Sequence, residues 1–135
     1  MNLVVDTSVW SLVLRRPRVD DSNRYVQAFR THLETNNRIF LLGNVLQELL
    51  DGLRSSTQFD RLKQLLEPFP LLDVDRSTYI AAAKLRSACR AKGVLASPID
   101  FLIAASCCHY GYPLLTADQD FTRIAKLCDL IILPE

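Results

Sequence analysis

Five acidic residues stand where predicted strands lead into helices, or just inside a predicted helix. Asp6 follows the apolar run LVV, and Asp118 and Asp120 follow the run PLLT. Asp100 lies just inside a predicted helix start at SPID, and Glu48 lies in the apolar stretch VLQELL. If the strands are parallel, all five acids fall at one edge of the sheet, because open α/β sheets build their sites at strand carboxyl ends.

Carboxylates gathered at one place need a partner. Two unit charges about 4 Å apart repel by roughly 4 kcal/mol at an effective dielectric near 20, so the group either takes up protons or holds a divalent cation. Oxygen ligands without a His or Cys cluster favour Mg²⁺ or Mn²⁺ over zinc or copper. Helix N-termini nearby suit anions such as phosphate. The pattern therefore indicates metal-assisted phosphodiester hydrolysis, with a nucleic-acid backbone as the natural substrate.

Each acid alone also has a purely structural explanation. Asp6 can cap the first helix, and Ser97 with Asp100 fits a capping box. Asp118 and Asp120 can cap the last helix, and Glu48 can lie on a solvated helix face. Coincidence is the weaker explanation of the whole set. Asp51, one turn after Glu48, is the rival for the same role.

The cysteines and histidines do not predict a metal site. Cys89, Cys107, Cys108 and Cys128 show no CxxC spacing, and the adjacent pair would point about 100° apart on a helix. With only two histidines in the chain, His32 and His109, we interpret the cysteines as small core residues in a reducing compartment.

The composition is typical of a globular protein, with 49% hydrophobic and 23% charged residues in 135. This length predicts a single domain over residues 1–135. The apolar runs are far shorter than the roughly 18 to 20 residues of a membrane helix, and the first residues read as a strand, so we expect a cytoplasmic protein without a membrane partner. The net charge of +1 says little about partners, although Arg15, Arg16, Arg18 and Arg24 cluster.

Apolar periodicity predicts alternating strands and helices. Strands are expected at 2–6, 38–42, 71–74, 113–116 and 130–133. Helices are expected directly after the first strand through Leu14, over about 20–35, from about 45 to 52, and over 55–66, 76–92, 97–110 and 118–127. Gly43 and Asn44 are expected to break the chain after the second strand and to cap the helix that follows. This alternation predicts an α/β fold, with a mostly parallel sheet of four or five strands covered on both faces.

Four motifs in this order resemble the PIN domain family: LVVDTSVW, VLQELLDGL, SPIDFLIAASC and LLTADQDF. The resemblance spans nearly the whole chain, and the compact form resembles the VapC toxins of toxin–antitoxin pairs. It implies a three-layer α/β/α sandwich and a Mg²⁺- or Mn²⁺-dependent ribonuclease that leaves 5′-phosphate ends. It also implies a homodimer and a cognate VapB-type antitoxin.

Carried over by position, the resemblance makes Asp6, Glu48 and Asp100 the first three acids. It leaves the fourth open between Asp118, which we favour, and Asp120. Thr7 and Thr116 match small polar positions that orient the acids or a metal-bound water. Arg15, Arg16 and Arg18 are then candidates for contacts to the RNA backbone.

Three alternatives remain. The first is a catalytically inactive PIN-like module that binds RNA or protein while its acids only cap helices. A phosphate-accepting receiver domain fits poorly, because the third predicted strand ends in DVDR and no lysine closely follows LLT. A phosphatase of the haloacid dehalogenase type needs a second aspartate two residues after the first, where Ser8 stands.

Overall fold

The computed structural model describes residues 1–14 and 22–135 of the chain. Arg15, Arg16 and Arg18, the sequence-based candidates for RNA contacts, lie outside the described residues. Arg24 lies inside them and donates hydrogen bonds to the carbonyl oxygens of Pro134 and Glu135, at 3.4 and 3.3 Å.

A five-stranded parallel sheet forms the centre of the structure, in the order β3-β2-β1-β4-β5. Its strands are β1 (Asn2–Val5), β2 (Arg38–Leu42), β3 (Leu71–Leu72), β4 (Leu114–Leu115) and β5 (Ile132–Leu133). The central strands β1 and β2 are almost continuously apolar and buried, as expected for a parallel sheet covered on both faces.

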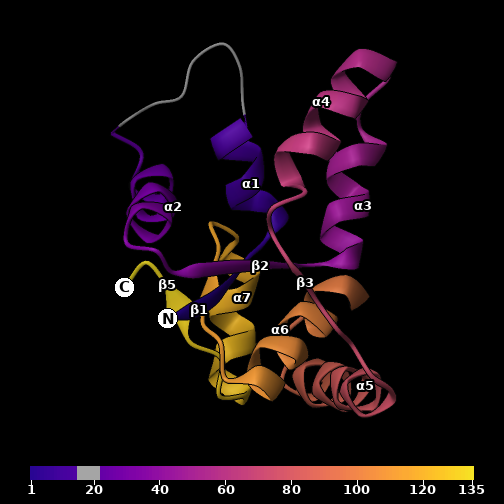
Figure 1. Ribbon diagram of the computed structural model, residues 1–135. Helices are drawn as coiled ribbons and strands as arrows, with labels where there is room; N and C mark the ends of the chain where they lie inside the picture. Colours follow the sequence, from indigo (N-terminus) through magenta and orange to yellow (C-terminus); the bar gives the residue numbers. More distant parts are fainter. Residues whose placement is uncertain (15–21) are drawn as a thin grey trace.

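Helices cover both sides of this sheet (Figure 1). On one side lie α1 (Thr7–Leu14), α2 (Arg24–Glu34), α3 (Gly43–Asp51) and α4 (Ser56–Leu66). On the other side lie α5 (Arg76–Ala91), α6 (Pro98–Tyr110), α7 (Gln119–Ile124) and the short 3₁₀ helix η1 (Ala125–Leu127). The predicted three-layer α/β/α fold is confirmed.

Polar side chains at the helix starts explain where the helices begin. Asn23, Ser55 and Asp75 each accept a hydrogen bond from a backbone N–H of the first turn of α2, α4 and α5, which satisfies donors that the helix leaves unpaired. Gly93 has a φ of 75° and follows α5, a conformation that glycine adopts without steric cost.

Trp10 is the centre of the core on the α1 side of the sheet. Its side chain is 1% exposed, and its ring makes edge-on contacts with Phe29 and Phe69, with centroids 5.1 and 5.0 Å away. These contacts join α1, α2 and the segment before β3. Trp10 is therefore a core residue that holds these three segments together.

Three element boundaries differ from the sequence-based expectation. Asn44 does not cap the helix that follows β2: the strand runs directly into α3, whose first residue is Gly43 and whose N-cap, Leu42, offers no side-chain bond. The last three strands are only two residues long. The predicted helix over 118–127 divides into α7 and η1, with Asp118 as the N-cap of α7.

Within the described residues, no helix combines the length and the apolar character that crossing a bilayer requires.

Candidate metal centre

Four of the predicted acids line one pocket of about 230 Å³ at the carboxyl edge of the sheet. Asp6 comes from the end of β1, Glu48 from α3, Asp100 from the first turn of α6, and Asp118 from the N-cap of α7. Thr7, Ser8, Ser97, Ile99 and Ile103 complete the lining. Residues more than 100 positions apart thus meet, because parallel strands end at the same sheet edge.

Asp6 is the most buried of these acids, at 4% exposure. Its Oδ1 accepts a hydrogen bond of 2.6 Å from the Ser8 hydroxyl, and its Oδ2 accepts one of 2.6 Å from the Thr116 hydroxyl. The backbone N–H of Val9 also donates to Oδ1, at 3.4 Å. These donors hold the carboxylate in one orientation at the base of the pocket.

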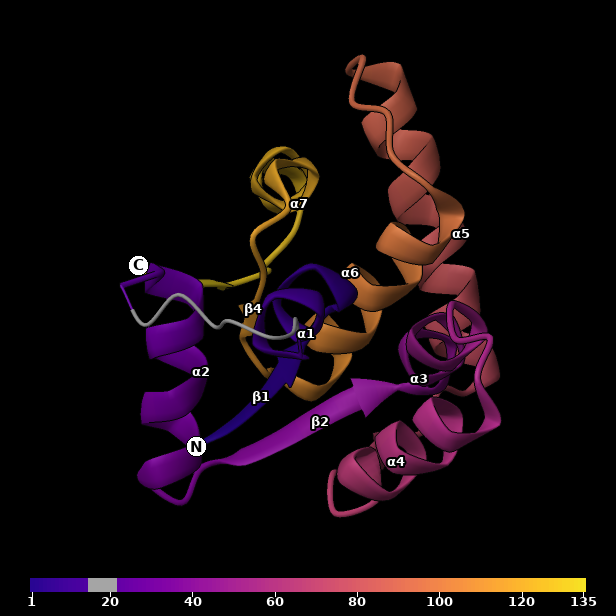
Figure 2. The same cartoon turned by 90° about the horizontal axis from the view of Figure 1, so that it is seen from above.

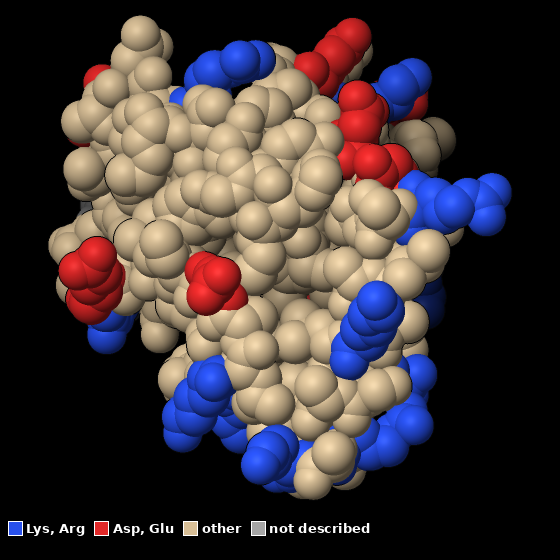
Figure 3. All heavy atoms as spheres, turned by 90° about the horizontal axis from the view of Figure 1, so that it is seen from below, with Lys and Arg blue, Asp and Glu red and all other residues tan. Residues whose placement is uncertain are grey.

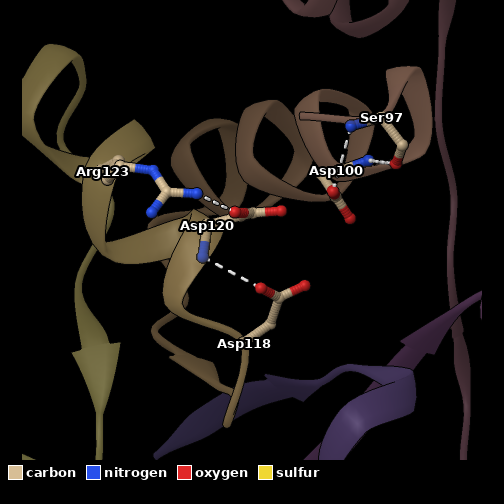
Figure 4. Close-up of polar contacts among 5 residues, drawn as sticks. All are labelled: Ser97, Asp100, Asp118, Asp120 and Arg123. Carbon is tan, nitrogen blue, oxygen red and sulfur yellow. Dashed lines mark hydrogen bonds and ion pairs between the residues drawn. The ribbon is translucent and has the colours of Figure 1, made fainter. Parts of the chain in front are cut away.

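Asp100, Asp118 and Asp120 form the second part of the acidic set (Figure 4). One carboxylate oxygen from each lies within 4.8 Å of the others. Asp118 accepts a hydrogen bond of 2.9 Å from the backbone N–H of Asp120, and Asp120 also forms an ion pair with Arg123. The three carboxylates come from the starts of two helices, α6 and α7.

Asp100 also completes a capping box with Ser97. The Ser97 hydroxyl accepts from the Asp100 N–H at 3.2 Å, and the Asp100 carboxylate accepts from the Ser97 N–H at 3.2 Å. The capping explanation and the metal-site explanation are therefore compatible, because an ionised carboxylate has about four lone-pair sites and the cap uses one.

Glu48 is an exposed residue that still lines the pocket. Asp51, its rival from the sequence, is exposed and is not among the residues that line the pocket. Asp120 does not line the pocket either, although it belongs to the group of three carboxylates. The structure therefore places both Asp118 and Asp120 near Asp100, with Asp118 nearer the other acids.

Burial and crowding favour protonation of two of these carboxyls. Burial raises the pKa of Asp6; the hydrogen bonds from Ser8, Thr116 and Val9 oppose that rise, and the charge of Asp118 adds to it. Burial also raises the pKa of Asp100, where hydrogen bonds with Ser97 oppose the rise and the charges of Asp118 and Asp120 add to it. Both shifts arise chiefly because burial penalises the ionised form of a carboxyl group.

A hard divalent cation fits this set of donors. The pocket offers carboxylate oxygens from several elements and no imidazole or thiol, and all-oxygen sites select Mg²⁺, Mn²⁺ or Ca²⁺. The cysteines lie elsewhere: Cys89 and Cys107 are buried and burial raises the pKa of both thiols, so they remain protonated core residues.

Ser8 is a site residue that sequence reasoning missed. Besides donating to Asp6, its hydroxyl accepts from the Ala117 N–H at 2.9 Å and lies 3.3 Å from the Thr116 hydroxyl. Ser8 therefore ties the loop after β1 to the loop after β4. Thr7, expected to orient the acids, lines the pocket. The sequence did contain a signal for this contact: a hydroxyl residue, Ser8, stands two positions after Asp6, and side chains at this spacing often form hydrogen bonds with each other in turns.

The model of the PIN domain matches residues 3–127 of this sequence. The chain belongs to the PIN domain family. Two curated relatives are each 30% identical to it over 130 residues, which is 95% of this chain and 95% of the relative: VapC ribonuclease Mb1587 of Mycobacterium bovis and ribonuclease VapC11 of Mycobacterium tuberculosis. The resemblance drawn from the sequence motifs is confirmed.

Solved structures share the fold. VapBC2 from Rickettsia felis, bound to a DNA fragment from its promoter, has a TM-score of 0.76 and 22% identity, covering 98% of this chain and 97% of that one. FitAcB from Neisseria gonorrhoeae has a TM-score of 0.72 and 23% identity, covering 99% and 97%. At 22% and 23% identity, this structural similarity shows that the chain has the same fold as those two proteins.

We expect Mn²⁺ or Mg²⁺ to raise the melting temperature of the protein at neutral pH. An ion at a hundred times its Kd stabilises the fold by about 2.7 kcal/mol. Asp100→Asn should diminish that increase and should also raise the melting temperature of the metal-free protein, because it relieves repulsion with Asp118 and Asp120. Thermal unfolding followed by circular dichroism, with the ion and with EDTA, measures both effects.

Asp60→Asn on α4 is the matched control, because Asp60 is exposed and is not among the residues that line the pocket. The stabilisation by metal should shrink as the pH falls, since protons compete for Asp6 and Asp100 at pH values above the usual range for aspartate. Over the same fall in pH, these two groups make the metal-free fold more stable, because the folded chain binds their protons more tightly than the unfolded chain does. Equal metal stabilisation of Asp100→Asn and Asp60→Asn would contradict the site.

The hydroxyl donors to Asp6 should control metal affinity. Thr116→Val or Ser8→Ala removes one donor and should weaken Mn²⁺ binding roughly ten- to a hundredfold, the usual effect of losing a group that orients a ligand. Isothermal titration with Mn²⁺ measures the change. Thr116→Ser retains the hydroxyl and should bind as the unmodified chain does; a normal affinity in Thr116→Val would show that orientation of Asp6 is not required.

Proposed function

We propose that this PIN domain protein is an endoribonuclease that uses Mg²⁺ or Mn²⁺ to hydrolyse RNA phosphodiester bonds, and that it is the toxin of a VapBC-type pair. The observation that supports this proposal most directly is the convergence of Asp6, Glu48, Asp100 and Asp118 on one pocket. The 30% identity to proteins named as VapC ribonucleases adds the reaction and the substrate class. One nuclease domain over residues 1–135 accounts for the activity.

In this proposal Asp6, Asp100 and Asp118 hold the ion, with Glu48 and Asp120 as further ligands. When bound, the ion supplies charge stabilisation at a phosphoryl oxygen and lowers the pKa of a water. The chain itself fixes the geometry: Ser8 and Thr116 orient Asp6, and Ser97 holds Asp100 against the start of α6. The N-terminus of α6 lies at the acids, because Asp100 is in its first turn, and a helix N-terminus favours a phosphate.

The comparison with solved structures supports one of the expected partners. Structures of similar fold are named VapBC2 and VapBC-1, and we infer a VapB-type antitoxin for this chain. We also infer that the chain forms a homodimer. Exposed apolar side chains support association with protein: Phe59 and Leu65 on α4 are 38% and 51% exposed, and Leu71 in the edge strand β3 is 48% exposed. A cytoplasmic location is part of this proposal, since a nuclease toxin acts on RNA inside the cell.

The alternative function is an inactive PIN-like module that binds RNA or protein. The capping bonds of Asp100 and Asp118 favour it, because they give both acids a structural role without a metal. The two functions differ in metal dependence: RNA binding by an inactive module is indifferent to EDTA.

The purified protein should cut single-stranded or structured RNA in Mg²⁺ or Mn²⁺ and leave 5′-phosphate ends. Asp6→Asn or Asp100→Asn should abolish cutting, since each removes a charge that holds the ion. Gel analysis of labelled RNA, with mapping of the ends, measures the reaction. Asp60→Asn should cut at the normal rate, and circular dichroism should show that all variants are folded. Full activity of Asp6→Asn would remove the proposal.

Light scattering during size-exclusion chromatography should give a mass of twice 15.3 kDa for the purified chain.

Phe59→Ser and Leu65→Ser, which make the exposed side of α4 polar, should weaken capture of a co-expressed VapB-type protein encoded beside this gene. Capture that is unchanged in both variants would exclude α4 as the contact for that partner.

A further inference from the structure

The helices α5 and α6 lie side by side (Figure 1 and Figure 2). A groove between them adjoins the acidic pocket. Its volume is about 490 Å³, and one face of α5 forms its longer wall, with Tyr79, Ala82, Ala83, Arg86, Ser87 and Arg90. Ile99 of α6 lines both the groove and the acidic pocket. A linear molecule bound at the acids can therefore continue past Ile99 into the groove.

The charge of α5 is one-sided. Between its first and last residues the helix carries Arg76, Lys84, Arg86 and Arg90 and no acid, and Lys92 follows at its C-cap. All five of these side chains are exposed, in a chain whose net charge is only +1. Figure 3 views the molecule from the side of α5, and Lys and Arg gather in the lower part of that face, where no acidic side chain is visible. This surface favours a polyanion.

Arg86 and Arg90 are the two cations that line the groove itself. They lie one turn apart, about 6 Å along the helix axis, so both can reach a backbone that follows the groove. Within residues 1–14 and 22–135, neither arginine forms an ion pair. The ion pair in this part of the chain is between Arg123 and Asp120. The guanidinium groups of Arg86 and Arg90 are thus open to phosphate, which arginine binds with two parallel hydrogen bonds.

The remaining lining suits the bases and sugars of a single strand. Tyr79 is 55% exposed and Ile99 is 43% exposed, and the alanines between Tyr79 and Arg86 leave the floor apolar. An exposed aromatic ring in a groove that also carries cations is the usual arrangement for single-stranded nucleic acid, in which bases stack while the backbone is neutralised. A second copy of this chain fits less well, because a two-fold contact through the groove would place arginine against arginine.

We infer that the α5–α6 groove binds single-stranded RNA on one side of the bond that is cut, with Arg86 and Arg90 on backbone phosphates and Tyr79 stacked on a base. This inference rests on the proposed ribonuclease function. It adds a binding surface that positions the RNA strand, separate from the acids that hold the ion.

The double variant Arg86→Gln/Arg90→Gln tests the groove. Its affinity for a fluorescein-labelled single-stranded RNA of about twelve nucleotides is measured by anisotropy in Mg²⁺, in an Asp6→Asn background so that no RNA is cut. We expect Kd to rise about tenfold. The slope of log affinity against log salt is negative, and we expect its magnitude to fall by about 1.4, which corresponds to two lost phosphate contacts on a single strand. Arg61→Gln/Lys63→Gln on α4 removes two exposed charges on the opposite layer and should change neither value.

Tyr79 supplies an independent measurement. Tyr79→Ser should raise Kd about fivefold or more without changing the salt slope, because stacking contributes affinity but no charge. Tyr79→Phe retains the ring and should restore the affinity. If Tyr79→Ser makes the salt slope shallower, or if it leaves the affinity unchanged, Tyr79 does not stack on a base and this part of the inference is overturned.

The outcomes separate the groove from the nuclease function. If the unmodified chain cuts RNA while the arginine double variant keeps its affinity and salt slope, the groove assignment is overturned and the nuclease proposal stands. If the unmodified chain neither cuts nor binds RNA, both are overturned. If the double variant loses self-association in light scattering and keeps its affinity for RNA, the groove is an interface between copies and the inference is wrong.

Discussion

Negative charge gathered at one edge of a sheet has to be balanced, and this requirement governs the arrangement of the loops after β1 and β4. Asp6 is almost fully buried, a position that an ionised carboxylate occupies only with donors around it. Ser8, Thr116 and the N–H of Val9 provide those donors. They do not neutralise the charge, however, which is why burial still raises the pKa of Asp6. A bound cation would supply the neutralising charge that hydrogen bonds do not.

The same carboxylates build the fold and the pocket. Asp100 closes the first turn of α6 and Asp118 caps α7, so both helix starts are fixed by the residues that face the acidic pocket. A capping bond leaves lone pairs of each carboxylate free, and it holds the side chain in one rotamer before any ligand arrives. The local requirement of the helix thus preorganises the site, which lowers the cost of ordering it on binding.

Much of this architecture could be predicted from the sequence, and the exceptions have identifiable causes. The apolar run before Asp6 and the SPID segment have strong local signals, so the positions of Asp6 and Asp100 at a strand end and a helix start follow from the chain itself. Asn44 was misinterpreted because an asparagine after a glycine usually marks a cap, whereas here the strand leads straight into α3. The two-residue strands β3 to β5 are too short for periodicity to define their ends.

Long-range neighbours were the harder part. The bond between Ser8 and the N–H of Ala117 joins residues 109 positions apart, and no local pattern encodes it. The groove beside the acids was equally hidden, because it depends on which face of α5 meets α6. Glu48 was partly predictable. Its helix could be predicted from the sequence, but the rotation of α3 about its own axis decides that Glu48, and not Asp51, lines the pocket.

Trp10 gives this molecule a built-in optical reporter. It is the one tryptophan of the chain, it is sealed between Phe29 and Phe69, and it stands one helical turn from Asp6. While the layers remain packed, the indole is shielded from water and its fluorescence maximum lies at short wavelength. The maximum moves to longer wavelength once water reaches the indole. Trp10 fluorescence can therefore distinguish a substitution that only removes an acid from the pocket, which leaves the emission unchanged, from one that loosens the packing around Trp10, which shifts it. The measurement needs no added label.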